Sequence, residues 1–259
     1  MNRHMATPSA ADVVAWLKKS GRKKARDGMA RYGLPSDHAV GISVGALKTK
    51  AKALGRDHDL AIALWTTGIY EARLLAAFVG DPARVTPAEM DRWCKDFDNW
   101  GVVDTVCFSL WDRSPHAFAK VRAWATRKPE FEKRAAFALL ACLALHDKAT
   151  KDDAPYLDSL KLIERAAADD RNFVKKGVSW ALRLIGRRNA ALNTAAIALS
   201  RRLAESDNPA SRWIGKGAVR ELTSPLVKRA LVRTQSTQRK QSTQRHRSGH
   251  PGELCIFCV

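Results

Sequence analysis

Apolar residues recur every three to four positions through most of the chain, which is the spacing of one face of an α-helix. Five apolar residues share one side of the helix predicted for residues 173–187: Val174, Val178, Ala181, Leu182 and Ile185. No run alternates with period two, and no Asn-Gly turn joins two apolar segments. The pattern therefore predicts an all-α protein.

Helix starts are marked by residues that favour N-termini. Thr86-Pro87-Ala88-Glu89 has the form of a capping box with proline at the first helical position. Ser114-Pro115 and Asn208-Pro209 repeat the cap-then-proline signal. Asp169-Asp170 place negative charge before the helix of residues 173–187, at the positive end of its dipole. These signals predict where separate helices begin.

The periodic segments follow one another every ~20 residues and pair into helical hairpins of ~40, the size of HEAT or armadillo units. Self-similarity between the units is weak. We therefore predict a degenerate α-solenoid, a HEAT-like or armadillo-like superhelix whose concave face is available to a long ligand.

The charge of the chain points to a polyanionic partner. The formal net charge is +19, and Met1–Arg56 alone carries 12 Lys+Arg against 3 Asp+Glu. From Thr234 the sequence becomes low in complexity, with Gln235–Arg239 repeated as Gln241–Arg245. That tail holds four Lys+Arg and one Glu, so +16 belongs to the rest of the chain. We predict a disordered N-terminus over 1–10, a helical domain over 11–233 and a disordered basic tail over 234–259.

Other classes of protein are disfavoured. The longest apolar run, Ala135–Leu145, is shorter than the ~20 residues of a membrane span, and no secretory signal is recognisable at the N-terminus. The odd number of cysteines favours buried thiols in a reducing cytoplasm over a metal or redox site at Cys255-x-x-Cys258. No phosphate-binding loop, zinc motif or dinucleotide motif occurs, so we expect no cofactor and no metal. His146-Asp147 is interpreted as a helix end rather than an acid–base pair.

One side of the helix predicted for residues 173–187 combines positive charge with an aromatic ring. Opposite its apolar face lie five other residues: Lys176, Ser179, Trp180, Arg183 and Arg187. Trp180 is interpreted as an exposed indole that faces nucleic acid. The alternative is that it packs against the next repeat, as most helical tryptophans do.

Two further positions are candidates for chemistry. Trp100 and Asp104 lie one helical turn apart, beside a predicted core face that includes Val103. A carboxylate on a phosphate-binding face repels the ligand, so Asp104 is either a structural cap or a functional group. Arg134 shares a helix side with Ala138, and either packs there or holds a phosphate.

Four blocks together resemble the AlkD-type DNA alkylation repair family: Asn99-Trp-Gly-Val-Val-Asp104, Leu110-Trp-Asp-Arg-Ser-Pro115, Lys133-Arg-Ala-Ala-Phe-Ala-Leu-Leu-Ala-Cys142 and Asp169-Asp-Arg-Asn-Phe-Val-Lys-Lys-Gly-Val-Ser-Trp-Ala-Leu-Arg183. The likeness covers roughly residues 11–233. It implies a HEAT-like superhelix whose basic concave face grips duplex DNA, and a monomeric glycosylase that removes N3- and N7-alkylated purines.

The resemblance also implies roles for individual residues. Asp104 would stabilise an oxocarbenium-like sugar and orient water, while Trp100 and Trp180 would pack against the deoxyribose. Arg134 would hold the DNA backbone near the lesion. We also expect four basic residues in and just after this last block to contact DNA: Lys175, Lys176, Arg183 and Arg187.

The partner implied is alkylated double-stranded DNA, with no obligate protein partner and no membrane. The expected location is the cytoplasm, in association with a bacterial nucleoid. The alternative function is that of a non-catalytic HEAT-repeat binder of branched or distorted DNA, because some relatives bind such DNA without excising a base.

Overall fold

The computed structural model describes residues 8–34, 37–147, 150 and 152–233. Within these ranges the chain forms α-helices and two short 3₁₀ segments, and no strand occurs among the described residues. The prediction of an all-α protein is therefore confirmed. The α-helices are α1 (Ala10–Ser20), α2 (Lys23–Asp27), α3 (Val44–Leu54), α4 (His58–Trp65), α5 (Tyr70–Val79), α6 (Pro87–Lys95), α7 (Trp100–Ser109), α8 (Ala117–Trp124), α9 (Glu130–His146), α10 (Ala154–Ala166), α11 (Asn172–Ile185), α12 (Ala190–Ala204) and α13 (Pro209–Leu222). The 3₁₀ segments are η1 (Met29–Tyr32) and η2 (Trp111–Arg113), and residues 225–233 form one more helical stretch.

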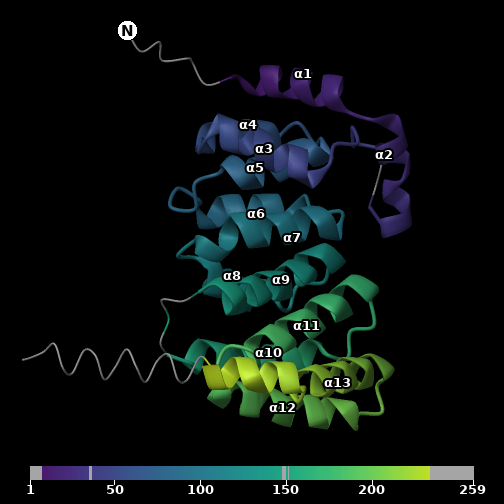
Figure 1. The fold of residues 1–259 in the computed structure, drawn as a ribbon, viewed down its shortest axis with the longest axis vertical. Coiled ribbons are helices and arrows are strands. Elements are labelled where there is room, and N and C mark those ends of the chain that lie inside the picture. The colour runs from purple at the N-terminus through teal and green to yellow at the C-terminus, as the bar shows by residue number, and fades with distance from the viewer. Residues whose placement is uncertain (1–7, 35–36, 148–149, 151, 234–259) are drawn as a thin grey trace, which may run out of the picture.

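Successive pairs of helices stack along the long axis of the molecule, from α1 at one end to α12 and α13 at the other (Figure 1). Alternate helices α3, α5, α7, α9, α11 and α13 pack against one another in sequence and form what we call the site row. The helices α4, α8, α10 and α12 pair with the site-row helix that follows each of them, and α8, α10 and α12 also contact in turn. This second row makes the molecule a stack of antiparallel hairpins, as predicted for a solenoid.

The repeat unit is shorter than the predicted ~40 residues. The first helices of successive hairpins start at His58, Pro87, Ala117, Ala154 and Ala190. The early units are compact because α4, α6 and α8 have only eight or nine residues each. Short second-row helices opposite a 17-residue α9 explain why the sequence shows no fixed period.

The core runs unbroken between the two rows and is rich in tryptophan. Trp65 and Trp93 stack with ring centroids 4.0 Å apart, and Trp111 and Trp124 are also fully buried. The thiols of Cys94, Cys107 and Cys142 are free and buried, as the apolar patterns around them predicted, whereas Cys255 and Cys258 lie outside the described residues. The predicted N-terminal and C-terminal tails likewise fall mostly or wholly outside them.

Two of the predicted helix starts are confirmed and one is wrong. The Thr86 hydroxyl accepts the Glu89 N–H at 3.2 Å, and the Asn208 side chain accepts the Ser211 N–H at 2.9 Å, each with a proline at the first positions of its helix. Ser114, in contrast, accepts the His116 N–H within a turn, and the next helix begins only at Ala117.

The His146–Asp147 dipeptide lies at the end of α9, as predicted. His146 Nδ1 contacts the carboxylate of Asp112, and Asp147 Oδ2 accepts a hydrogen bond from the Tyr156 hydroxyl at 3.0 Å. The two side chains therefore join α9 to different neighbours. Across the described residues, no helix combines the length and apolar character that crossing a bilayer requires.

Candidate functional site

A carboxylate and a guanidinium meet at the centre of the site row. Asn99 caps α7 by accepting the Val102 N–H at 2.9 Å, which fixes the rotation of the helix from its first turn. Since Val102, Val103 and Val106 face the core, Asp104 lies on the flank of α7 that faces α9. There Arg134 donates two hydrogen bonds to it, from Nε to Oδ1 at 3.1 Å and from Nη2 to Oδ2 at 2.7 Å.

The Asp104 carboxylate is only partly open to solvent. Its side chain is 23% exposed, against 7% for that of Arg134. Burial raises the pKa of the Asp104 carboxyl, while the Arg134 guanidinium acts in the opposite direction. A carboxylate has about four lone-pair positions, so the bidentate contact leaves about two of them for another group.

Arg134 does not extend towards solvent as a free phosphate ligand. Its third nitrogen, Nη1, donates to the backbone carbonyl of Phe173 at 2.7 Å, so the guanidinium joins α7, α9 and α11. The neighbouring Ala138 and Ala141 are buried in the helix contact. The two predicted alternatives were that Arg134 packs between helices or that it holds a phosphate. In the structure it packs between helices and, in addition, positions the Asp104 carboxylate.

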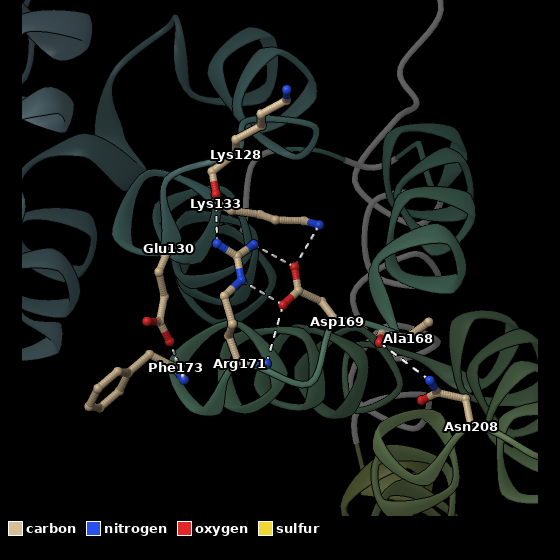
Figure 2. Close-up of polar contacts among 8 residues, drawn as sticks. All are labelled: Lys128, Glu130, Lys133, Ala168, Asp169, Arg171, Phe173 and Asn208. Carbon is tan, nitrogen blue, oxygen red and sulfur yellow. Dashed lines mark hydrogen bonds and ion pairs between the residues drawn. The ribbon is translucent and has the colours of Figure 1, made fainter.

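A second polar network fixes the start of α11 against the start of α9 (Figure 2). The Phe173 N–H donates to Glu130 Oε1 at 3.0 Å. Asp169 accepts from both Lys133, at 2.9 Å, and Arg171, at 2.6 Å. These cations hold the pKa of Asp169 well below its ordinary value. Asp169 precedes α11 as predicted, but its carboxylate links two helices and holds the Phe173 carbonyl where Arg134 reaches it.

Trp100 is held at the edge of the same site. Its indole Nε1 donates to the backbone carbonyl of Tyr32 at 2.8 Å, which brings the η1 segment over the N-terminus of α7. A backbone contact of this kind orients the ring through a bond that does not depend on another side chain. Tyr32 itself is 68% exposed, so the segment forms a rim and not a core contact.

These groups line a pocket of about 550 Å³. Its walls come from Trp100 and Asp104 of α7, Arg134 of α9, Phe173 and Lys176 of α11, and the segment Arg31–Gly33. Asp104 is the one carboxylate among the lining residues, and the other charged residues are cations. In the part of the chain that the structure describes, no three His, Cys, Asp or Glu side chains gather as they would around a metal ion.

Trp180 lies outside this pocket and is less exposed than predicted. It is half-buried, packs against the core, and lines a separate cleft with Arg187 and Leu226. Ser179, which was expected on the exposed side, is buried. The reason is that α13 packs on this side of α11 and covers part of it.

The basic residues predicted in and just after α11 lie in three different places, and α11 ends at Ile185, before Arg187. Lys176 is exposed at the Asp104 pocket, whereas Lys175 places its Nζ 5.3 Å from the ring centroid of Trp213. Arg183 and Arg187 both approach Glu221 of α13, at 2.6 and 3.6 Å. The structure therefore gathers Trp100, Asp104, Arg134 and Lys176, and leaves the remaining predicted site residues in adjoining clefts: Trp180, Lys175, Arg183 and Arg187.

Another cleft of the site row is strongly cationic. It has a volume of about 390 Å³ and is lined by four basic side chains and two aromatic rings: Lys48, Lys52, Arg56, Arg113, Phe78 and Phe108. The two lysines belong to the basic sequence Lys48-Thr-Lys-Ala-Lys52. No carboxylate lines this cleft. It gives the N-terminal half of the site row a surface that attracts anions.

Sequence reasoning missed three residues of these sites. Phe173 was assigned only to a helix start. Tyr32 contributes a backbone carbonyl, which a pattern of side chains cannot predict. Trp213 was not part of any motif that the sequence analysis recognised. A helical projection of residues 209–222 would have placed Trp213 one turn from Lys216 and Gly217. The Tyr32–Trp100 contact, however, spans 68 residues and has no local signal.

Comparison with known proteins supports the fold and gives the family. No curated protein sequence matches the chain. A solved structure from a family of proteins related to the HEAT-like repeat DNA glycosylases, with affinity for branched DNA structures, superposes with a TM-score of 0.68 at 20% identity, covering 83% of this chain and 96% of that one. This likeness confirms the HEAT-like fold. The model of a family described as DNA alkylation repair enzymes matches residues 13–222. The chain belongs to the DNA alkylation repair enzyme family.

Proposed function

We propose that this protein is a DNA glycosylase that hydrolyses the N-glycosidic bond of cationic N3- or N7-alkylated purines in duplex DNA. The observation that carries the proposal is Asp104, a fixed carboxylate in a pocket whose other charged residues are cations. A negative charge disfavours phosphate binding, so its position on a DNA-binding surface calls for a compensating role. Stabilising a positively charged sugar is such a role, since charge developing in a transition state is what a fixed carboxylate stabilises.

The chemistry requires few groups because the leaving base is already positively charged. An alkylated purine departs as a neutral base, so no general acid is needed to protonate it. Asp104 is accordingly the one carboxyl side chain among the pocket residues. Its free lone-pair positions would hold the attacking water against the sugar carbon, while its charge stabilises the oxocarbenium-like transition state.

The other pocket residues would position the reacting nucleotide. Arg134 is a positioning residue, because it acts on the reaction through the orientation of Asp104. The rings of Trp100 and Phe173 line the pocket beside it and offer π faces to a cationic sugar. Lys176 is exposed at the same pocket and would contact the phosphate next to the reacting nucleotide.

The surroundings suit a duplex better than a small ligand. Along the site row, the cleft with Lys48 and Lys52 lies on one side of the Asp104 pocket, and the groove with Lys216 and Arg220 on the other. Cations spread over several helices match the regular phosphates of a DNA backbone.

A second candidate function is the binding of branched or distorted DNA without catalysis. Three observations favour it. Both oxygens of Asp104 are bonded to Arg134, which reduces the charge that the carboxylate presents, and Trp180 does not line the Asp104 pocket. The similar solved structure belongs to a family with affinity for branched DNA structures.

Base release distinguishes the two candidates. Duplex DNA treated with a methylating agent is incubated with wild type and with Asp104→Asn, and free 7-methylguanine is measured. We expect the wild type to release the base and Asp104→Asn to be at least about 100-fold slower, the usual effect of removing one electrostatic stabiliser. Asp158→Asn removes the same charge from an exposed position on α10 and should retain full activity.

The binding of the same proteins to junction DNA completes the comparison. If the wild type binds alkylated duplex and releases no base, the glycosylase proposal is wrong. Junction affinity that is unchanged or tighter in Asp104→Asn would then support the second candidate, because one phosphate-repelling charge has been removed. A roughly tenfold weaker junction complex, about 1.4 kcal/mol, would contradict that candidate too.

A further inference from the structure

Trp213 is the most exposed tryptophan that the structure describes. It lies on α13 and is 50% exposed, whereas four other tryptophans are buried in the core. The ammonium group of Lys175 lies 5.3 Å from its ring centroid. Trp buries large apolar areas when it packs, so an indole that stays half in water beside a cation has the character of a recognition residue.

The Trp213 groove gives this indole a defined setting. The groove has a volume of about 380 Å³ and is lined by Ser179 and Arg183 of α11 and by Trp213, Lys216, Gly217, Arg220 and Glu221 of α13. Arg183 and Glu221 neutralise each other at 2.6 Å. Lys216 and Arg220 are exposed, and neither forms an ion pair with another described residue. The Trp213 groove therefore combines an aromatic surface with a net positive charge.

The groove has free space above the backbone of Gly217. A Cβ atom added to Gly217 would meet nothing within 4 Å, although the residue lies in the middle of α13. A flat ring can therefore approach the helix between Trp213 and Lys216 without a clash. Trp213 and Gly217 are four positions apart, so both lie on the same side of α13.

The Trp213 groove adjoins the Asp104 pocket along α11. Lys176 lines the pocket and Ser179 lines the groove, and three residues advance a helix by about 4.5 Å. Successive nucleotides of a strand are about 3.4 Å apart along a duplex. A strand whose sugar occupies the Asp104 pocket would therefore pass close to the Trp213 groove.

We propose that the Trp213 groove binds an unpaired nucleobase of a DNA strand, with the base stacked on the indole and the adjoining phosphates near Lys175, Lys216 and Arg220. In a duplex the faces of the bases are covered by their neighbours, so an indole at the surface has no ring to stack on. An unpaired base exposes both faces, and stacking on an aromatic side chain is the usual way in which proteins hold it. The proposal rests on the proposed function in that DNA is taken as the ligand.

The test compares two DNAs that differ only in an unpaired segment. One is a labelled duplex, and the other is the same duplex with a single-stranded arm that carries 2-aminopurine. The wild type should bind the armed DNA more tightly and quench the 2-aminopurine fluorescence by stacking. Trp213→Ala should weaken armed-DNA binding by about tenfold and abolish the quenching, while duplex affinity changes by less than about twofold.

Three further variants make the test specific. Trp213→Phe keeps an aromatic face and should retain most of the preference and the quenching. Gly217→Leu fills the groove, removes a helix-destabilising glycine, and should lose the preference in a protein that remains folded. Leu157→Ala removes an exposed apolar side chain from α10 of the second row and should behave as wild type.

The outcomes separate this inference from the proposed function. A wild type that prefers neither DNA, or a Trp213→Ala variant that weakens both complexes equally, overturns the assignment of the groove to an unpaired base and leaves the glycosylase proposal standing. A wild type that binds neither DNA at low salt overturns the proposed function and this inference with it. Retained quenching in both Trp213→Ala and Gly217→Leu also overturns the assignment, because the base would then be stacked elsewhere.

Discussion

At the scale of single residues, the paired side chains of Asp104 and Arg134 should make the proposed reaction sensitive to pH. Burial raises the pKa of Asp104, and Arg134 is the group that opposes the rise. The proposed chemistry needs the ionised carboxylate, so activity is present above this pKa and is lost as the pH falls through it. The acid limb of base release should therefore lie above the ~3.9 of an ordinary aspartate.

Removing the guanidinium should move that limb further. In Arg134→Met the opposing charge is absent, so the pKa of Asp104 rises and base release fails at a higher pH than in the wild type. Arg134→Lys retains the charge and should shift the limb less. Single-turnover base release between acid and neutral pH measures the effect, with circular dichroism at each pH to confirm folding. An acid limb at the same pH in all three proteins would show that Asp104 does not set it.

At the scale of helices, two glycines of α13 differ in the space around them. A Cβ on Gly215 would lie 2.2 Å from the backbone nitrogen of Ala204 and 2.6 Å from the carbonyl oxygen of Ser200, whereas a Cβ on Gly217 would touch nothing. The obstructing atoms are the backbone of α12, which cannot rotate away. The close approach of α12 and α13 therefore requires a glycine at position 215 but not at position 217.

The two alanine variants should differ in the sign of their effect on stability. Gly215→Ala is expected to lower the free energy of unfolding by about 2 kcal/mol or more, because overpacking outweighs the gain in helix propensity. Gly217→Ala should raise it by up to about 1 kcal/mol. Urea denaturation of both variants at one pH measures the difference. Equal effects would mean that α13 does not sit as close to α12 as the structure shows.

The same helices show what the sequence can and cannot predict. Arg134 and Ala138 were predicted to share one side of a helix, and both lie on α9, because such a pattern is read directly from local spacing. Trp100 and Asp104 could be paired for the same reason, since they lie one turn apart. The contacts that build the pocket, Arg134 with Asp104 and Trp100 with Tyr32, join residues 30 and 68 positions apart and depend on how the rows stack.

The errors have the same physical origin. Trp180 was predicted to be exposed because one helix viewed alone cannot show that Glu221 of α13 and the segment 224–227 lie beside it. Ser114 was predicted to cap a helix because the serine–proline signal is local, and a turn that ends at His116 uses the same hydroxyl. Tertiary contacts therefore decide the cases in which a local pattern fits more than one structure.

At the scale of the whole molecule, the position of the charge matters more than its sum. The net charge of +19 is spread over many surfaces, and the cations at the Asp104 pocket and in the cleft beside it come mainly from the site row and the segments next to it. Lys48 and Lys52 lie four residues apart on α3, and both line the cationic cleft. Lys161 and Arg165 have the same spacing on α10 of the second row and are also exposed.

Replacing either pair by glutamine removes two positive charges from the chain, and the proposed DNA surface predicts different results. Lys48→Gln with Lys52→Gln should lower the slope of log affinity against log salt by up to about 1.8, because each lost phosphate contact releases fewer counterions. Lys161→Gln with Arg165→Gln should leave the slope near that of the wild type. Titrations of labelled duplex at several salt concentrations give both slopes. If the two pairs lower the slope equally, net charge alone attracts the DNA, and the site row is not its binding surface.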